Sequence, residues 1–247
     1  MTGLSFVSLI SYDWKYSFES ISSYYDIADE IILGIDKNRM TWAGNPFILP
    51  DEFFDEIKKI DRDNKIKIVE GDFCKELNPM DNDIAERTYL ANQCILGNWV
   101  VQIDADEIVE DPVSLKLAIL SAPKDKQIRI KWKTVFKELP EGKLIIYPYE
   151  EITTIASMQR NNFVSARVTN QPGHLIEGYL FHNSWGRTEL ELYTKLVNWS
   201  HAFDFPTKKY LDFWKSVDIN NYMTFKNFHP LDGHSWKELI FEPATKR

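Results

Sequence analysis

A short acidic stretch offers the clearest chemistry in this sequence. Residues 100–111 read VVQIDADEIVED, in which an apolar run leads into five acidic side chains. Like charges this close repel one another unless a cation or solvent relieves them. Asp104 and Asp106 flank one residue at the end of the apolar run, so in an extended chain their carboxylates point the same way. We therefore expect the pair to hold a hard divalent cation, Mn²⁺ or Mg²⁺. The alternative is an acidic turn that only solvates the end of a strand.

The elements before Asp104 have to position these carboxylates. Apolar runs at residues 4–11 and 30–35 predict two strands, residues 65–70 predict a third, and residues 99–103 predict a fourth that ends at the acidic pair. Helical spacing between the runs predicts strand-helix repeats with short joints. Such repeats are typical of a mostly parallel α/β sheet flanked by helices, in which ligands bind outside the carboxyl ends of the strands.

The helix before the fourth strand is the best marked. Asp83 and Glu86 have the spacing of a capping box, which predicts a helix start there, and Gly97 is placed to end the helix. Ile84 and Ala91 lie on its expected buried face. This helix is expected to lead directly into the strand that carries the acidic pair.

The second half of the sequence has a different pattern of apolar and polar residues. Residues 127–136 and 143–149 alternate as antiparallel strands around a turn at 140–142, and helical patterns begin at Glu189. We expect one domain over residues 1–247, composed of a nucleotide-binding half, an acceptor-side half that completes the metal site, and a C-terminal helical extension. These three parts span residues 1–111, 112–188 and 189–247.

Composition narrows the class of protein. The chain has 247 residues, a formal net charge of -8 and 44% hydrophobic residues, which is typical of a globular protein and argues against a nucleic-acid partner. No apolar run reaches transmembrane length, and the N-terminus lacks a secretory signal pattern. Cys74 and Cys94 lie in no paired spacing. We expect a cytoplasmic protein without a transmembrane segment.

Longer stretches resemble a known family. The segment GNWVVQIDADEIVED, preceded by AERTYLANQCIL, is similar to glycosyltransferase family 2, whose members have the GT-A fold. The stretches SFVSLISYDW and ADEIILGID stand where that family has its first two strands. The resemblance implies a metal-dependent transferase with a nucleoside-diphosphate-sugar donor, such as a UDP- or GDP-sugar. The acceptor would be a glycan, a lipid-linked saccharide or a protein, and transfer would invert the anomeric centre.

The resemblance also assigns roles in the first half. Asp36 would contact the base or ribose of the donor, Asp104 the ribose or metal, and Asp106 the metal directly. Arg87 would approach the nucleotide from its helix, although pairing with neighbouring acids is an alternative. Ser11 belongs to the expected nucleotide-sugar site, but the turn that it begins departs from the commoner wording of the family, in which a Pro and an Asn follow the first strand.

In the second half, YLFHNSWGRTELELYTKLVNWSH resembles the closing segment of some family members. His182 is the expected third metal ligand, and Arg187 or Lys195 would face the diphosphate. Residues 185–187 would form a flexible lid; a packed Trp185 and a solvated Arg187 are the alternative.

An inverting transfer needs a base that takes the proton of the acceptor hydroxyl. Glu177 is the expected catalytic base because it is the carboxylate nearest His182 in the chain, with Glu150 and Glu151 as rivals.

Two other functions fit parts of the sequence. An apolar strand followed by D-x-D also describes the nucleophile loop of haloacid-dehalogenase-like phosphatases and phosphotransferases, in which the first aspartate attacks phosphorus. That motif normally opens its fold, whereas three strand-helix units precede it here. A non-catalytic carbohydrate-binding protein would account for the aromatic content of 14%.

Overall fold

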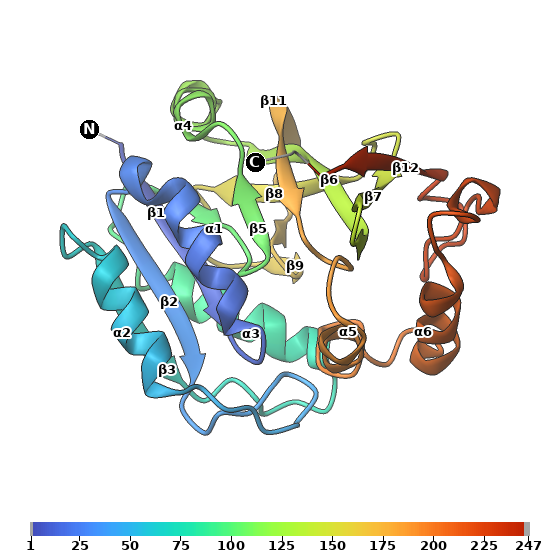
Figure 1. The fold of residues 1–247 in the computed structure, drawn as a ribbon. Helices are drawn as coiled ribbons and strands as arrows, with labels where there is room; N and C mark the ends of the chain where they lie inside the picture. Colours follow the sequence, from blue (N-terminus) through green and yellow to red (C-terminus); the bar gives the residue numbers. More distant parts are fainter. Residues whose placement is uncertain (1, 245–247) are drawn as a thin grey trace.

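The computed structural model describes residues 2–244, which form helices and a long, curled sheet (Figure 1). The strands of the sheet are β1 (Leu4–Ile10), β2 (Glu30–Asp36), β3 (Ile66–Gly71), β4 (Trp99–Gln102), β5 (Glu107–Val109), β6 (Gln127–Leu139), β7 (Gly142–Tyr147), β8 (Ile152–Ser157), β11 (Gly173–His182) and β12 (Glu238–Pro243). A separate two-stranded sheet contains β9 (Phe163–Ser165) and β10 (Val168–Thr169). The α-helices are α1 (Ser17–Tyr24), α2 (Asp51–Ile60), α3 (Pro79–Ala91), α4 (Pro112–Ser121), α5 (Glu189–Leu196) and α6 (Thr207–Ser216). Within these residues, no helix has the length and hydropathy of a membrane span.

The main sheet is mixed. Its strands follow the order β12-β7-β6-β8-β4-β1-β2-β3, and β11 pairs with β6 and with β5. The strands β3, β2, β1 and β4 are parallel, as is the pair β6 and β11, whereas β4, β8, β6, β7 and β12 join one another in antiparallel pairs. The predicted α/β class is confirmed. The parallel arrangement holds for the first four strands, and the second half of the chain adds antiparallel strands to it.

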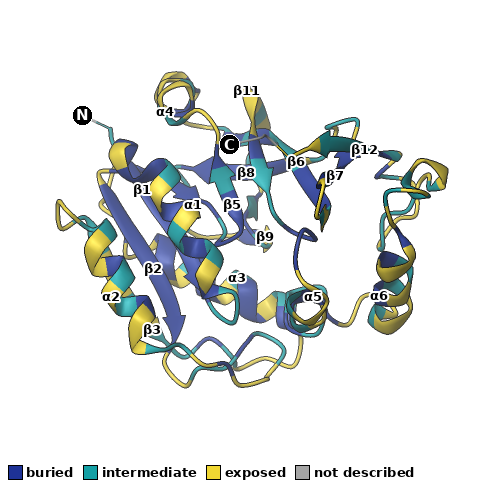
Figure 2. Cartoon of the chain, viewed as in Figure 1, coloured by how far each residue is buried: buried dark blue, intermediate teal, exposed yellow. Residues whose placement is uncertain are grey.

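Alternation along the parallel strands explains how helices cover both faces. In β1, Phe6 packs in the cluster that includes residues of α1, α2 and α4, while Val7 packs with residues of α3. Residues of a strand alternate between the two faces, so a strand that is buried on both faces is apolar throughout. All seven residues of β1 and of β2 are buried, and the helices expose their outer sides (Figure 2).

Helix α3 begins earlier than predicted. Asn78 caps it by accepting a hydrogen bond from the backbone N–H of Met80, and Pro79 occupies the first turn, where a missing N–H costs nothing. The proposed capping box at Asp83 and Glu86 is therefore wrong, because both residues lie in the middle of the helix on its buried face. The helix ends at Ala91, and Gly97 adopts a positive φ in the turn before β4.

The C-terminal part is not helical throughout. After α5 and α6 the chain returns to the sheet, where β12 pairs antiparallel with β7. Trp185, Leu196, Trp214 and Trp236 pack together with residues of β6 and β7 in a second apolar cluster. All three predicted segments therefore contribute strands to one sheet.

Candidate functional site

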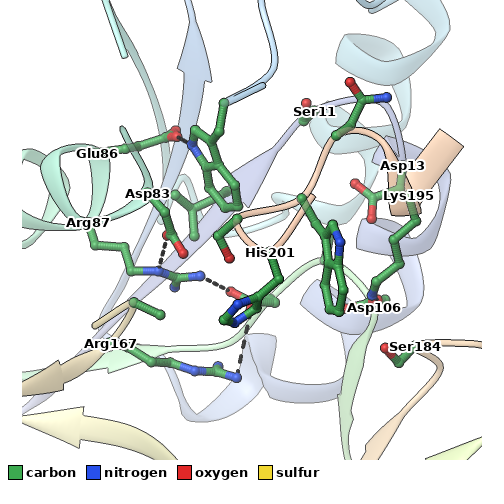
Figure 3. Close-up of a pocket in the computed structure, with 18 of the residues that line it drawn as sticks. Ser11, Asp13, Asp83, Glu86, Arg87, Asp106, Arg167, Ser184, Lys195 and His201 are labelled. Atoms are coloured by element: carbon green, nitrogen blue, oxygen red, sulfur yellow. Dashed lines mark hydrogen bonds and ion pairs between the residues drawn. The ribbon is translucent and has the colours of Figure 1, made fainter. Parts of the chain in front are cut away.

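A cavity of about 540 Å³ lies beside the carboxyl ends of β1, β2 and β4 (Figure 3). This is where an open sheet of parallel strands binds ligands. The ionisable groups that line the cavity come from both halves of the chain: Asp13, Asp36, Asp83, Glu86, Arg87, Asp104, Asp106, Arg129, Arg167, His182, Lys195 and His201. Of the predicted nucleotide-sugar and metal residues, all except Arg187 line it, Ser11 included.

Asp104 lies in the turn after β4 and is paired with two arginines. Its carboxylate is 3.0 Å from Arg87 and 3.6 Å from Arg167. Burial opposes the charged form of Asp104, but Arg167 and Arg87 outweigh it and lower its pKa. Glu107 stabilises the turn by accepting a hydrogen bond from the backbone N–H of Asp104 at 2.8 Å.

Asp106 is more deeply buried and has its own pair of cations. Its Oδ2 accepts hydrogen bonds from Arg187 at 2.5 Å and from Lys195 at 2.6 Å. Burial again opposes ionisation, yet Lys195 and Arg187 hold the pKa of Asp106 well below its ordinary value. The repulsion expected between the two aspartates is thus relieved by four basic side chains.

The predicted metal ligands are only partly brought together. Asp106 Oδ1 and His182 Nε2 are 3.7 Å apart, and burial lowers the pKa of His182 to about 3, so the imidazole is neutral as metal binding requires. Two metal–ligand bonds of about 2.1 Å together exceed this separation, so one ion could contact both atoms. Asp104 is instead directed to its arginines. Among residues 2–244, no group of three or more His, Cys, Asp or Glu side chains is arranged to hold a metal ion.

Arg87 is buried on the inner face of α3. Its guanidinium donates hydrogen bonds to Asp83 at 2.5 Å, to Gln102 at 3.1 Å and to Asp104 at 3.0 Å. Arg87 therefore both lines the cavity and pairs with a neighbouring acid, Asp83, so the two predicted alternatives occur together. Helical spacing of four residues between Asp83 and Arg87 is the sequence signal for the second contact.

Arg167 is the main residue that the sequence did not reveal. It lies between β9 and β10 and donates two hydrogen bonds to the buried carboxylate of Glu107, at 2.5 and 2.7 Å. Trp132 donates a further hydrogen bond to Glu107 at 2.7 Å. This contact spans 60 residues of the chain, and no local pattern marks it.

Asp36 organises the loop that follows β2. Its carboxylate accepts hydrogen bonds from the backbone N–H groups of Asn38, Met40 and Phe73 at 2.8 to 3.1 Å. Asp36 lines the cavity, but most of its acceptor capacity is used by the backbone. Its predicted contact with the nucleoside stays a prediction.

Trp42 and Glu86, which line the cavity together with Asp36, form a hydrogen-bonded pair. The indole N–H of Trp42 donates to Glu86 at 2.7 Å. Burial raises the pKa of Glu86 to about 8, an effect that the hydrogen bond from Trp42 reduces. A neutral carboxyl group beside an aromatic ring suits contact with a flat heterocycle.

The predicted catalytic base is placed elsewhere. Glu177 is exposed on β11 and is not among the residues that line the cavity. Glu177 lies five residues before His182, in a stretch of β11 whose register with β6 shifts between Leu175 and Tyr179. Glu150 and Glu151 also lie outside the cavity lining. The structure therefore does not bring any of these three carboxylates into the lining of the cavity.

The predicted lid is also corrected. Trp185 is buried in the C-terminal apolar cluster, and its backbone N–H donates to Val135 at 3.1 Å. Arg187 is buried behind Asp106 and also donates to Asp13 at 3.0 Å, so it supports the cavity without lining it.

Residues 198–201 close the cavity from the C-terminal side instead. Asn198 accepts hydrogen bonds from Thr41 at 2.8 Å and from Asn45 at 3.0 Å, which ties this segment to the loop after β2. His201 extends into the cavity (Figure 3), and its Nδ1 lies 2.6 Å from Asp204 Oδ2. Because a carboxylate accepts, this bond places a proton on Nδ1, so it is Nε2 that carries the lone pair in the neutral imidazole.

Comparison with known proteins adds little to this geometry. No protein-family model and no curated protein matches the chain. Among solved structures, a mannose-6-phosphate isomerase from Helicobacter pylori is similar over 59% of this chain, with 13% sequence identity and a TM-score of 0.34. The match covers 56% of the isomerase chain, so this chain spans a little over half of its length. A likeness at this level carries no argument about fold family or activity.

Proposed function

We propose that this protein is a glycosyltransferase that moves a sugar from a nucleoside-diphosphate-sugar donor to an acceptor hydroxyl. The observation that supports the proposal is that predicted site residues far apart in the sequence lie together in the structure. Four separate stretches of the sequence contribute Asp36, Arg87, the pair Asp104 and Asp106, and Lys195, and all of these residues line one cavity. A volume of about 540 Å³ falls within the usual range for small-molecule and cofactor sites.

The basic side chains of the cavity can bind a diphosphate without giving up their acidic partners. A guanidinium has five N–H donors, and Arg87 uses three of them for the hydrogen bonds to Asp83, Gln102 and Asp104. An ammonium has three donors, and Lys195 uses one of them for Asp106. The remaining donors are available to phosphate oxygens. A divalent cation held by Asp106 and His182 would add positive charge at the same phosphates.

In the proposed transfer, the acceptor oxygen forms a bond to the anomeric carbon as the bond from that carbon to the phosphate oxygen breaks. The electron pair of the breaking bond leaves with the diphosphate, whose charge Arg87 and Lys195 stabilise. The proton of the acceptor hydroxyl goes to a base. We assign that role to His201, since Asp204 orients its imidazole and Nε2 is free to accept.

The test is donor hydrolysis, which many transferases catalyse slowly with water as the acceptor. UDP-, GDP- and dTDP-sugars are incubated with the protein and Mn²⁺, and released nucleoside diphosphate is measured. We expect release from one nucleotide class, reduced at least tenfold in Lys195→Met. Release of phosphate from a phosphomonoester, with no release from any nucleotide sugar, would instead favour the phosphatase alternative, and binding without any release would favour a non-catalytic protein.

A further inference from the structure

The cations that line the cavity differ in their partners. Arg87 is paired with Asp83 and Asp104, Arg167 with Glu107, and Lys195 with Asp106. Arg129 also lines the cavity, yet among residues 2–244 its guanidinium has no ion pair and no hydrogen bond. A partly buried guanidinium without an acceptor is unfavourable, because the charge has lost part of its hydration and gained nothing in return.

The sheet places Arg129 at a distance from the acidic pair. Arg129 lies opposite Thr154 on β8 and Leu175 on β11, whereas His182, which faces Asp106, lies opposite Thr134. Five residues along β6 separate the two positions, which corresponds to roughly 16 Å at about 3.3 Å per residue. This distance accommodates one or two sugar rings between the diphosphate end of the cavity and Arg129.

A glycine on the neighbouring strand makes room for the side chain. A Cβ atom at Gly173 would come within 2.5 to 2.7 Å of three atoms of the Arg129 side chain. The guanidinium therefore lies directly over the backbone of β11, in a position that any other residue at 173 would obstruct. Thr153 and Thr154 line the cavity beside it, and their hydroxyls donate to the Thr154 carbonyl and to Gln127, respectively.

We propose that Arg129 binds an anionic group, a carboxylate or a phosphate, on the acceptor substrate. A guanidinium matches the two oxygens of such a group through parallel hydrogen bonds. The proposal rests on the glycosyltransferase function above, which assigns the other end of the cavity to the donor. The acceptor is then an acidic saccharide or a phosphorylated saccharide. The site should bind neutral sugars more weakly.

The experiment is a ligand-observed NMR titration of the protein with D-glucuronic acid, D-glucose 6-phosphate and D-glucose, each with and without saturating UDP or GDP. The first two probes distinguish a carboxylate from a phosphate. The wild-type protein is expected to bind at least one of them about tenfold or more tightly than D-glucose, as a charge-assisted hydrogen-bonded pair allows. Arg129→Ala is expected to lose that preference.

Two further variants sharpen the result. Lys131→Ala removes the same charge from the same strand, but Lys131 does not line the cavity, so this control keeps the preference. Gly173→Ala retains the guanidinium and displaces it, so we expect weaker binding of the acidic sugars without a change in charge. This variant also provides a test if Arg129→Ala fails to fold.

The proposal is overturned if the wild-type protein binds all three sugars equally, if it binds none of them, or if Arg129→Ala retains the preference. Nucleoside-diphosphate binding is measured on the same samples and is expected to be unchanged in Arg129→Ala. If the wild-type protein binds no nucleoside diphosphate, the proposed transferase function is contradicted. If it binds a nucleoside diphosphate but does not prefer the acidic sugars over D-glucose, only the role of Arg129 is contradicted.

Discussion

The two ends of the cavity treat charge in opposite ways. At the end that contains Asp104 and Asp106, each aspartate contacts two basic side chains, and these contacts are buried at Asp106 and partly buried at Asp104. At the other end, Arg129 has a position prepared by Gly173 and no acidic partner among the described residues. The paired charges hold distant segments of the chain together, while the single charge contributes little to folding and is available to a ligand. Stability and binding should therefore respond differently to mutation at the two ends.

The largest effect on stability is expected at Asp106. Asp106→Asn leaves Lys195 buried without its carboxylate and Arg187 with Asp13 alone, which should lower the free energy of unfolding by about 3–5 kcal/mol. Urea unfolding measures this difference. The sequence alone predicts that Asp106→Asn leaves folding intact, because it shows only repulsion among neighbouring acids.

Glu110 is the matched control, since it is an exposed acid four residues away. Glu110→Gln should change the free energy of unfolding by less than about 0.5 kcal/mol. Equal stability of the two variants would contradict the view that the paired end of the cavity supports the fold.

A second prediction concerns pH. Burial raises the pKa of Glu86 from its ordinary value of 4.5, which holds in the unfolded chain, to about 8 in the folded protein. Between these values the folded state holds one more proton, so the free energy of unfolding should fall as the pH rises from 4.5 to 8 and then level off. At about 1.36 kcal/mol per pH unit, the loss is at most about 4–5 kcal/mol.

Glu86→Gln should remove this slope and keep the hydrogen bond from Trp42. The measurement is a series of urea unfolding curves from pH 5 to pH 9 for both proteins. If the free energy of unfolding depends on pH in the same way in both proteins, Glu86 is already ionised in the folded state at pH 5.

A third, smaller effect is expected in catalysis. Asp204→Asn weakens the orientation of His201, so turnover should fall about tenfold, equivalent to about 1.4 kcal/mol, and nucleotide affinity should stay the same. Because the pair is half-exposed, stability should change little. Comparison of donor hydrolysis with transfer to an acceptor checks the role of the base, and unaltered turnover would remove His201 from the mechanism.

The smallest effect on stability is expected at the unpaired end. Arg129→Ala should change the free energy of unfolding by less than about 1 kcal/mol, because no ion pair among the described residues is lost. Urea unfolding beside Asp106→Asn makes the comparison direct. A loss as large as that of Asp106→Asn would show that Arg129 is a structural cation.

Local patterns predicted much of the first half correctly. The strands near residues 4, 30, 66 and 99 are all present, and Asp104 and Asp106 lie at the expected strand end. Continuous apolar runs mark β1, β2 and β4, whose residues are all buried, whereas β3 at the sheet edge has no buried residue. The cap at Asn78 was missed because Asp83 and Glu86 mimic a capping box. Their burial instead reflects contacts with Arg87 and Trp42, which the spacing of the sequence only partly shows.

Long-range contacts explain the failures in the second half. Glu177 is near His182 in sequence, but it is exposed on β11 and outside the cavity that His182 lines. Arg167 and His201 reach the cavity through folding of segments with no distinctive local motif. Ion pairs between residues 60 or more positions apart leave no periodicity to detect, so their partners appear only in three dimensions.

The most direct test of the proposed function is nucleotide binding. Thermal unfolding is followed with UDP, GDP and dTDP, each with and without Mn²⁺, since a ligand that binds the folded state raises its stability. We predict that one nucleoside diphosphate raises the Tm of the wild-type protein and that Lys195→Met largely removes the shift. If no nucleoside diphosphate changes the Tm under either condition, the cavity is not a nucleotide-sugar site.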